Sequence, residues 1–460
     1  MSSSRSFSAV PQGTGYEIPS AALGVGDVRT SSRRARYALA ALVASGSLVA
    51  VAAAHTTALL PETIRPVPPA LAGVFNGIGL DLHGGGAIAV LTLVFISYAF
   101  VVRFAGELST RTVLMGIAAL HAFVLLAPPL VSTDIFSYQS YARMGALYGT
   151  NPYTHGPYAI SLDGVFPYIG SKWSYIPTAY GPVFTVFSYL LVPLSIAASV
   201  FAYKSIAALA SIALVAVVWH CARLRGGNPV RAAALVGLNP LLVIYAVGGG
   251  HNDLLMLLAM TGGIYAVLAS RDRQGASLSV LAAGLKLTGG LVLPFALVAG
   301  GPNRGRPRRD LLLGTALGIA LIGTFSLIVF GTGSFDMLST VQHSQAEGGW
   351  QSLPGFIGAG LGVTAGHIAG YIMAAGFLGI TGRLLWRVWK GQMDWIDGAA
   401  WAMVAMLLAS SSLLPWYVAW LLPLAALAHD RRLTRVMLVL TAVVQFIQML
   451  GYIPHGSGLL

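Results

Sequence analysis

The chain has 460 residues, of which 56% are hydrophobic and only 9% are charged, and its formal net charge is +12. A soluble domain carries about 25% charged residues, so this composition excludes a water-exposed surface of ordinary extent. The positive charge does not indicate nucleic-acid binding, because the arginines stand in short clusters between apolar segments, as expected of a membrane protein.

Residues 1–32 are polar and rich in serine and glycine, and they contain no apolar stretch. We therefore expect a disordered cytoplasmic tail there and no signal peptide. The arginines at 33–36 directly precede the first apolar segment and predict a cytoplasmic N-terminus. Residues 33–460 are expected to form a single transmembrane domain.

Apolar segments long enough to cross a hydrocarbon core of about 30 Å as helices recur along this domain. The weak alternation of a β-barrel is missing, so the predicted fold class is all-α, a polytopic integral membrane protein with about 11–13 transmembrane helices. Spans are predicted at about 37–60, 84–104, 111–131, 203–222, 231–247, 252–270, 311–330, 364–389, 396–413, 415–428 and 433–452.

Two further apolar segments, 178–198 and 277–299, are assigned from charge. Because the basic clusters should all be cytoplasmic, an odd number of crossings must separate the loop after the third span from the arginines at 223–231. If 203–222 crosses, 178–198 lies along the membrane interface. Basic residues flank 277–299 on both sides, and its glycines and Pro294 suit a broken re-entrant hairpin. If both segments crossed instead, two basic clusters would change sides.

This topology leaves two long loops outside, 132–200 with interfacial helices and 331–355. Asp134 follows the third predicted span at the membrane boundary. It could cap a helix, since Ser132, Thr133 and Asp134 are all good N-cap residues. It could instead be a general base, because a carboxylate beside apolar surface should have a raised proton affinity and can take a proton from an attacking hydroxyl.

Aromatic and basic side chains gather at the same predicted boundary. They suit stacking on sugar rings, and an aromatic belt at the bilayer interface explains any single aromatic equally well. The candidate substrate-binding residues are Tyr138, Arg143, Tyr175, Tyr180, Trp416 and Tyr417.

A glycine-rich turn, GGGHNDLL at 248–255, opens another predicted helix. Three glycines let a ligand approach the backbone, and a helix N-terminus beside His251 suits an anionic phosphate. The alternative is a tight turn with Asn/Asp capping. We expect His251 to contact the ligand and Asn252 or Asp253 to cap the helix, and both also remain substrate-binding candidates. Lys286 lies within an apolar segment, where an ionisable residue marks a functional site unless it reaches up to the interface.

Motifs of soluble nucleotide-binding enzymes, zinc hydrolases and serine hydrolases are absent from the sequence. An active site facing away from the cytoplasm also lacks access to nucleotide sugars. An activated donor would therefore have to be carried on a lipid.

Five segments in order make the chain resemble the GT-C superfamily, and more closely the actinobacterial polyprenol-phosphomannose-dependent α-1,6-mannosyltransferases of lipomannan synthesis. The segments are STDIFSYQSYARMGALYGTNPYTHGPYA, WSYIPTAYGPVF, NPLLVIYAVGGGHNDLLML, AAGLKLTGGLVLPF and LLPWYVAWLLPL. The family usually has Trp-Arg where this chain has Trp173-Ser174 after Lys172.

The resemblance implies an inverting transfer of mannose from a polyprenyl-phosphate donor to a mannoside or glycolipid acceptor outside the plasma membrane. It implies that Asp134 is the catalytic base and that His251 and Lys286 lie near the donor phosphate. Lys204 matches a basic position that could also contact this phosphate. Some relatives bind a divalent cation, but the sequence contains no clear ligand set, and no metal site is assigned.

A transporter or flippase of a glycolipid or small solute is the alternative function. It should contain internal repeats and ionisable residues in the middle of its spans. The polar residues here stand mostly at the predicted outer boundary, which favours an enzyme.

Overall fold

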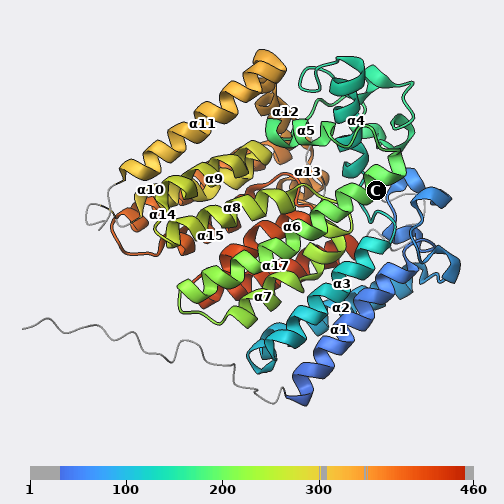
Figure 1. Cartoon of the computed structure of the whole chain (residues 1–460), viewed down its shortest axis with the longest axis horizontal. Coiled ribbons are helices and arrows are strands. Elements are labelled where there is room, and N and C mark those ends of the chain that lie inside the picture. Colours follow the sequence, from blue (N-terminus) through green and yellow to red (C-terminus); the bar gives the residue numbers. More distant parts are fainter. Residues whose placement is uncertain (1–31, 300, 302–307, 347–348, 350, 451–460) are drawn as a thin grey trace, which may run out of the picture.

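A computed structural model describes residues 32–299, 301, 308–346, 349 and 351–450, and every regular element in that part of the chain is a helix (Figure 1). The predicted fold class, an all-α polytopic membrane protein, is confirmed. The predicted tail lies outside the described residues except for Ser32. So do residues 451–452 of the last predicted span and 347, 348 and 350 of the second predicted loop.

Six of the described helices are long and apolar enough to cross a membrane. They are α1 (Arg33–Ala52), α2 (His83–Phe104), α6 (Ile196–Leu224), α11 (Arg309–Phe330), α14 (Val363–Trp389) and α17 (Arg431–Leu450). A seventh crossing would result if α7 (Pro229–Gly237) and the π-helix Leu241–Val247, which meet at 45°, formed one bent span.

The remaining predicted spans coincide with shorter apolar helices. These are α3 (Thr110–Leu126), α8 (Asp253–Leu268), α15 (Trp395–Ala409) and the Pro415–Leu427 segment, in which a 3₁₀-helix (Pro415–Leu421) continues into α16 (Leu422–Leu427). Every predicted span therefore falls on an apolar helix, but only six or seven described helices have the length to cross.

The predicted basic clusters meet at one end of the bundle, which we call the basic end, at the lower left of Figure 1. At the end of α6, Arg225 pairs with Asp394 just before α15 at 2.9 Å. Arg273 pairs with Asp310 at the start of α11, also at 2.9 Å. These two contacts join the segments in pairs, and Figure 1 shows the helix ends that carry them on the same side of the bundle.

The segment 277–299 forms a broken hairpin, as predicted. α9 (Asp272–Leu285) leaves the basic end, and the chain breaks at Lys286, whose ammonium group bonds to Asp253 at the far end of α8. A 3₁₀-helix (Leu287–Leu291) and α10 (Val292–Val298) then return, and Arg308 bonds to the Leu297 carbonyl at the basic end. A side chain at Gly289 would lie 2.8 Å from the Ala282 carbonyl oxygen, so the tight return requires glycine there.

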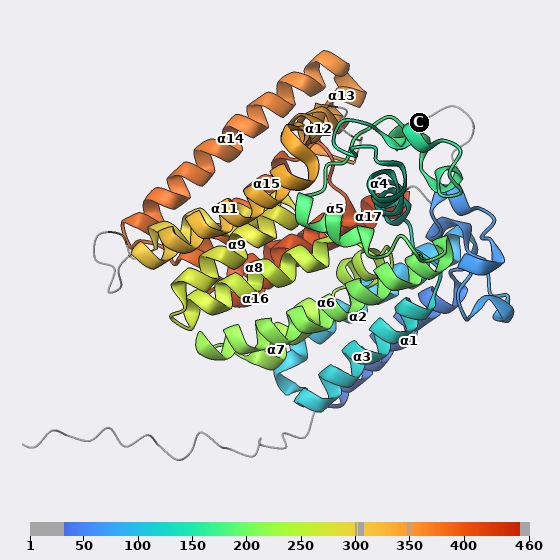
Figure 2. The ribbon, with the colours of Figure 1, turned by 45° about the horizontal axis from the view of Figure 1, so that its top comes forward.

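The segment 178–198 does not cross as a helix of its own, which confirms that part of the prediction. α5 (Pro182–Tyr189) has eight residues, and turns connect it to the start of α6 at Ile196. α5 lies across the end of the bundle opposite the basic end, beside α4 (Asp134–Tyr148), in both views (Figures 1 and 2). We call this end the loop end.

Two irregular segments, 53–82 and 149–181, cover the loop end together with α12 (Asp336–Ala346) and α13 (Leu353–Leu361) (Figure 2). Short 3₁₀-helices punctuate the connections. They are Thr57–Leu59, Glu62–Ile64, Pro69–Leu71, Asn76–Ile78, Ala105–Glu107, Pro157–Ile160, Phe166–Tyr168, Ser171–Trp173 and Gly331–Phe335.

Candidate active site

Asp134 is the first residue of α4, and its carboxylate takes no part in capping that helix. The N-cap is Thr133, which makes no side-chain cap bond, while the Asp134 N–H donates to Ser132 Oγ at 3.2 Å. The chain before it is fixed by a bond from Leu130 N to the Gly248 carbonyl at 3.0 Å. This bond ties the start of α4 to the glycine-rich turn, and the Asp134 side chain stays 20% exposed.

The glycine-rich turn places His251 against Asp134. Gly250 has a φ of +65°, which favours glycine, and a side chain on Gly249 would lie 2.6 Å from Nε2 of His251. The His251 N–H donates to the Ala246 carbonyl of the π-helix at 2.9 Å. The imidazole of His251 therefore packs against the backbone of the turn, and only glycine leaves room for it there.

Four charged or titratable side chains from three segments form a continuous buried cluster. His251 Nδ1 lies 3.3 Å from Asp134 Oδ2 and 4.0 Å from Asp253 Oδ2. The other oxygen of Asp253 accepts bonds from Lys286 Nζ at 2.8 Å and from Trp420 Nε1 at 2.5 Å. The side chains of Asp134 and Lys286 are partly exposed, whereas those of His251 and Asp253 are completely buried.

Aromatic rings from the Pro415–Leu421 helix line one side of this cluster. Trp416 stacks on His251 with ring centroids 3.9 Å apart, and Lys286 Nζ lies 5.0 Å from the Tyr417 ring centroid and 5.1 Å from that of Trp420. Trp420 was not among the predicted site residues. Its spacing of three residues from Tyr417 could have revealed it, because a 3₁₀-helix has three residues per turn.

Asn252 and Asp253 do not cap α8 with their side chains, so the expected capping is wrong. Asn252 occupies the N-cap position without a side-chain cap bond, and the Asp253 carboxylate is engaged by Lys286 and Trp420. Asn252 Oδ1 instead accepts from the Tyr138 hydroxyl at 3.4 Å. Tyr138 packs edge-on against Tyr180 at 4.8 Å, so both predicted tyrosines adjoin the cluster.

Three of the candidate residues are engaged outside the cluster. Arg143 Nε bonds to both oxygens of Asp163, at 2.8 and 2.9 Å. Tyr175 is 69% exposed and stacks on Tyr158 at 4.7 Å. Lys204 is buried and donates to the carbonyls of Ala127 and Pro128, beyond the end of α3. It thereby satisfies backbone acceptors that the helix leaves free.

The pKa of Asp134 lies below its ordinary value, which corrects the expected raised proton affinity. Burial raises this pKa, but the hydrogen bond and charge of His251, together with the charge of Lys286, lower it by more. The expectation considered only the apolar surroundings and could not include a histidine 117 positions away in sequence. Asp134 is consequently ionised at neutral pH and can accept a proton.

Several buried polar atoms around the cluster have no hydrogen-bond partner among the described residues. They are Nε2 of His251, whose Nδ1 contacts Asp134, and Asn252 Nδ2, Asp253 Oδ2 and Trp416 Nε1. An unsatisfied buried polar atom costs about 1–3 kcal/mol, so this concentration indicates a place where a polar ligand completes the bonding. Within the described ranges, no group of three or more His, Cys, Asp or Glu side chains is arranged to hold a metal ion.

A helical membrane bundle with a partly exposed carboxylate beside buried charges defines a polytopic membrane protein with a proton-accepting polar site. Residues 40–300 match the family model described as alpha-(1->6)-mannopyranosyltransferase, N-terminal domain, and residues 354–460 match the MptB C-terminal domain. The chain belongs to the α-(1→6)-mannopyranosyltransferase family.

Similar curated proteins carry the same description. The chain is 30% identical to alpha-(1->6)-mannopyranosyltransferase A of Mycobacterium tuberculosis, over 67% of this chain and 65% of the relative. It is 27% identical to alpha-(1->6)-mannopyranosyltransferase B of Corynebacterium glutamicum, over 66% of this chain and 57% of the relative. The matches thus span less than two thirds of these relatives' lengths. No solved structure gives a significant match.

Proposed function

We propose that the protein is an inverting glycosyltransferase that moves a mannosyl residue from a polyprenyl-phosphate donor to a mannoside or glycolipid acceptor, forming an α-1,6 linkage. The family and the names of the relatives support the sugar and the linkage. The active site would face away from the cytoplasm at the plasma membrane, because the basic clusters lie at the opposite end of the bundle.

The observation that carries this proposal is the position of Asp134. It is the most exposed side chain of the charged cluster, and it adjoins His251, whose Nε2 lacks a hydrogen-bond partner among the described residues. An acceptor hydroxyl could therefore approach Asp134 on one side, while the donor phosphate lies toward His251 and Lys286.

In the proposed reaction, the acceptor hydroxyl gives its proton to the Asp134 carboxylate while its oxygen bonds to the anomeric carbon. The bond from that carbon to the lipid-phosphate oxygen breaks in the same displacement, so a β-linked donor yields an α-mannoside. The leaving phosphate keeps the bonding electrons. Lys286 and His251 would stabilise the charge that develops there, in a site largely closed to water.

The reading as a transporter receives less support. Ionisable residues along a transport pathway should occur at mid-bundle, whereas the charged cluster here lies at the loop end, at the starts of α4 and α8.

The activity test uses membranes containing the full chain, a radiolabelled mannosyl polyprenyl phosphate and a synthetic α-mannoside acceptor. Asp134→Asn should strongly reduce transfer while the protein remains folded, and Ser161→Ala on the exposed loop surface should not change it. Full activity of Asp134→Asn would overturn the assignment of the base. Transfer that is absent in the wild type would overturn the donor or the acceptor class.

The orientation test places Ser161→Cys in the same loop, since Cys221 is the sole native cysteine and is buried. A membrane-impermeant maleimide added to intact cells should label this variant and not the wild type. Labelling only after the cells are opened would reverse the proposed orientation.

A further inference from the structure

The linker that leads into Asp134 is buried and has few hydrogen-bond donors of its own. It comprises residues 127–133 between α3 and α4, and residues 127–130 are all buried. Pro128 and Pro129 carry no N–H group, so this part of the chain can satisfy itself only in part. Buried backbone carbonyls need partners, and these have to come from elsewhere in the fold.

Lys204 of α6 supplies two of these partners from inside the bundle. It is 1% exposed, and its ammonium group donates to the carbonyls of Ala127 and Pro128, to the second at 2.9 Å. A buried cation is costly unless its bonds are made, and the two carbonyls make them. An ammonium group so deeply buried and so engaged is not available to the donor phosphate.

Val131, in the same linker, has a strained backbone. Its φ is +62°, in the left-handed region that a β-branched residue rarely adopts. The Ser132 N–H donates to the Leu130 carbonyl at 2.6 Å, so these three residues form a γ-turn of the rare, strained kind. Such a conformation persists only where the surrounding structure holds the chain in place.

Three other segments hold this γ-turn. The Leu130 N–H donates to the Gly248 carbonyl, and the Val131 N–H donates to the Leu59 carbonyl, each at 3.0 Å. Lys204 fixes the two carbonyls just before the turn. The strained turn is therefore tied to parts of the chain that are distant from it in sequence.

The stem of Lys204 also lies against the glycine-rich turn. A side-chain carbon on Gly250 would lie 3.5 Å from Cγ of Lys204 and 2.6 Å from Cδ1 of Ile135, the residue after Asp134. Lys204 thus stands between the backbone that carries Asp134 and the turn that carries His251, whose side chains approach to 3.3 Å.

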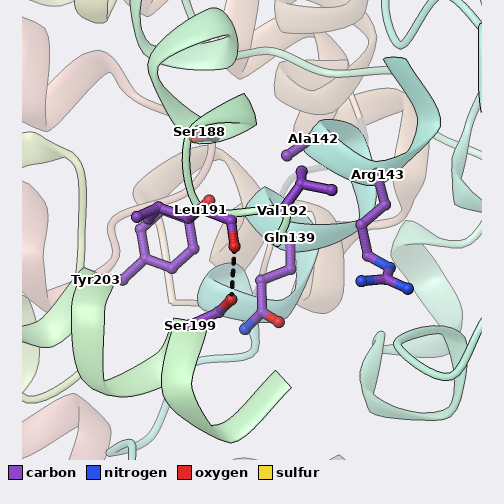
Figure 3. Close-up of a pocket in the computed structure, with 8 residues that line it drawn as sticks. All are labelled: Gln139, Ala142, Arg143, Ser188, Leu191, Val192, Ser199 and Tyr203. Carbon is purple, nitrogen blue, oxygen red and sulfur yellow. Dashed lines mark hydrogen bonds between the residues drawn. The ribbon is translucent and has the colours of Figure 1, made fainter. Parts of the chain in front are cut away.

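The start of α6 is itself anchored beside α4, which gives Lys204 a fixed support. Tyr203 packs against Tyr138 of α4 with ring centroids 5.6 Å apart. Ser199 donates its hydroxyl to the Leu191 carbonyl at 3.2 Å, which is the dashed line in Figure 3. Ser199 and Tyr203 both line the small pocket between α4 and α6 that this figure shows.

We propose that Lys204 is a positioning residue, which holds the strained turn at Val131 and so keeps the Asp134 carboxylate in contact with His251 before substrate binds. This inference rests on the proposed role of Asp134 as the base. Without Lys204 the strained turn relaxes, and the start of α4 moves with it. A base that is held in place in advance need not be ordered during the reaction.

The first test is Lys204→Met, which keeps an unbranched stem and removes the ammonium group. Amide hydrogen exchange in peptides that cover 127–137 should become at least about 10-fold faster, because the linker opens more often. The kcat of mannosyl transfer should fall about 10- to 100-fold at nearly unchanged KM for the donor, the usual result of a displacement of about 1 Å. Lys390→Met, at an exposed lysine after α14, is the matched control and should behave as the wild type does.

Glycine at position 131 separates positioning from any other role of Lys204. Because glycine adopts a φ of +62° without strain, the turn then no longer has to be held. Lys204→Met combined with Val131→Gly should regain at least about 5-fold of the lost kcat, and its exchange should slow. Val131→Ala removes the same methyl groups but keeps the Cβ atom, so combined with Lys204→Met it should regain less than about twofold.

Wild-type exchange in Lys204→Met would overturn the proposal, because the linker would not need the ammonium group. A raised KM for the donor at unchanged kcat would overturn it in favour of a phosphate contact, and so would equal recovery by Val131→Ala and Val131→Gly. If Lys204→Met does not fold, Lys204→Gln, which keeps one donor group, replaces it with the same expected directions. Transfer that is absent in the wild type would overturn the proposed function alone, because exchange still reports whether Lys204 holds the linker.

Discussion

Two clusters at the loop end contain similar groups in different bonding states. In the first, Asp163 accepts bonds from Arg143, from the Tyr148 hydroxyl at 2.8 Å and from the Val165 N–H at 2.9 Å, so both carboxylate oxygens are engaged. In the second, Asp253 has one oxygen bonded to Lys286 and Trp420, and its other oxygen lacks a hydrogen-bond partner among the described residues.

The pKa direction does not distinguish the two clusters, but the completeness of their hydrogen bonding does. Burial raises the pKa of Asp163, while the Val165 N–H, Tyr148 and Arg143 lower it by more, so the net direction is downward, as it is for Asp134. A complete set of bonds indicates a structural cluster that holds a loop. Unsatisfied atoms beside a partly exposed carboxylate indicate a site that a substrate completes.

The largest expected effect comes from Asp134→Asn, which keeps the shape of the side chain and removes the base. Transfer should fall about 10²- to 10⁴-fold, the usual contribution of a general base. Initial rates at saturating donor and acceptor measure this loss. A change confined to KM would instead assign Asp134 to binding, and the contrast between the two clusters would weaken.

Lys286→Met tests whether the second cluster also supports the fold. It leaves the Asp253 charge buried without its cation, which should cost about 3–5 kcal/mol of stability along with the activity. The double variant Asp253→Asn with Lys286→Met should recover most of the stability and none of the activity. Thermal unfolding in detergent reports the role of Lys286 in stability, and the transfer rate reports its role in activity. Recovered activity in the double variant would contradict a role of Lys286 in transfer.

His251→Gln tests the cause of the lowered pKa of Asp134. Transfer requires the ionised carboxylate, so activity is lost as the pH falls through the pKa of Asp134. Without the bond and charge of His251, the pKa of Asp134 rises and the acid limb of kcat/KM moves to higher pH. Residual activity measured from pH 4 to 8 reports the shift, and an unmoved limb would exclude His251 as its cause.

The smallest effect on activity is expected from Asp163→Asn in the structural cluster. The substitution weakens a charge-assisted pair and should lower stability by about 1–3 kcal/mol. The transfer rate of the folded fraction should change less than about twofold. A loss of transfer rate comparable to that of Asp134→Asn would instead mean that Arg143 contacts the substrate, as the sequence predicted.

Local rules made much of the fold predictable. The length of the apolar segments located the helices, and the arginine clusters correctly indicated which helix ends lie together. The glycines around Lys286 indicated the break in the hairpin, which the structure contains at that residue. The length of α15 was overestimated, and the predicted span 415–428 begins with a 3₁₀-helix, because hydropathy does not register where a helix ends or changes its type.

The residues of the candidate site were predictable in part. An unpaired carboxylate at a span end, a glycine-rich turn with histidine and a lysine in an apolar segment each stood out, and the structure brings Asp134, His251 and Lys286 into one cluster through Asp253. Lys204 stood out for the same reason as Lys286, yet it satisfies backbone carbonyls near the end of α3.

Local composition is enough to identify a helical membrane protein, its basic helix ends and its chemically unusual residues. The packing of the folded chain makes Trp420 and Lys286 share one oxygen of Asp253 and stacks Trp416 on His251. It also decided that the pKa of Asp134 is lowered rather than raised. Apart from the Lys286–Asp253 bond, these outcomes depend on contacts between residues more than 100 positions apart, which a pattern of neighbours does not specify.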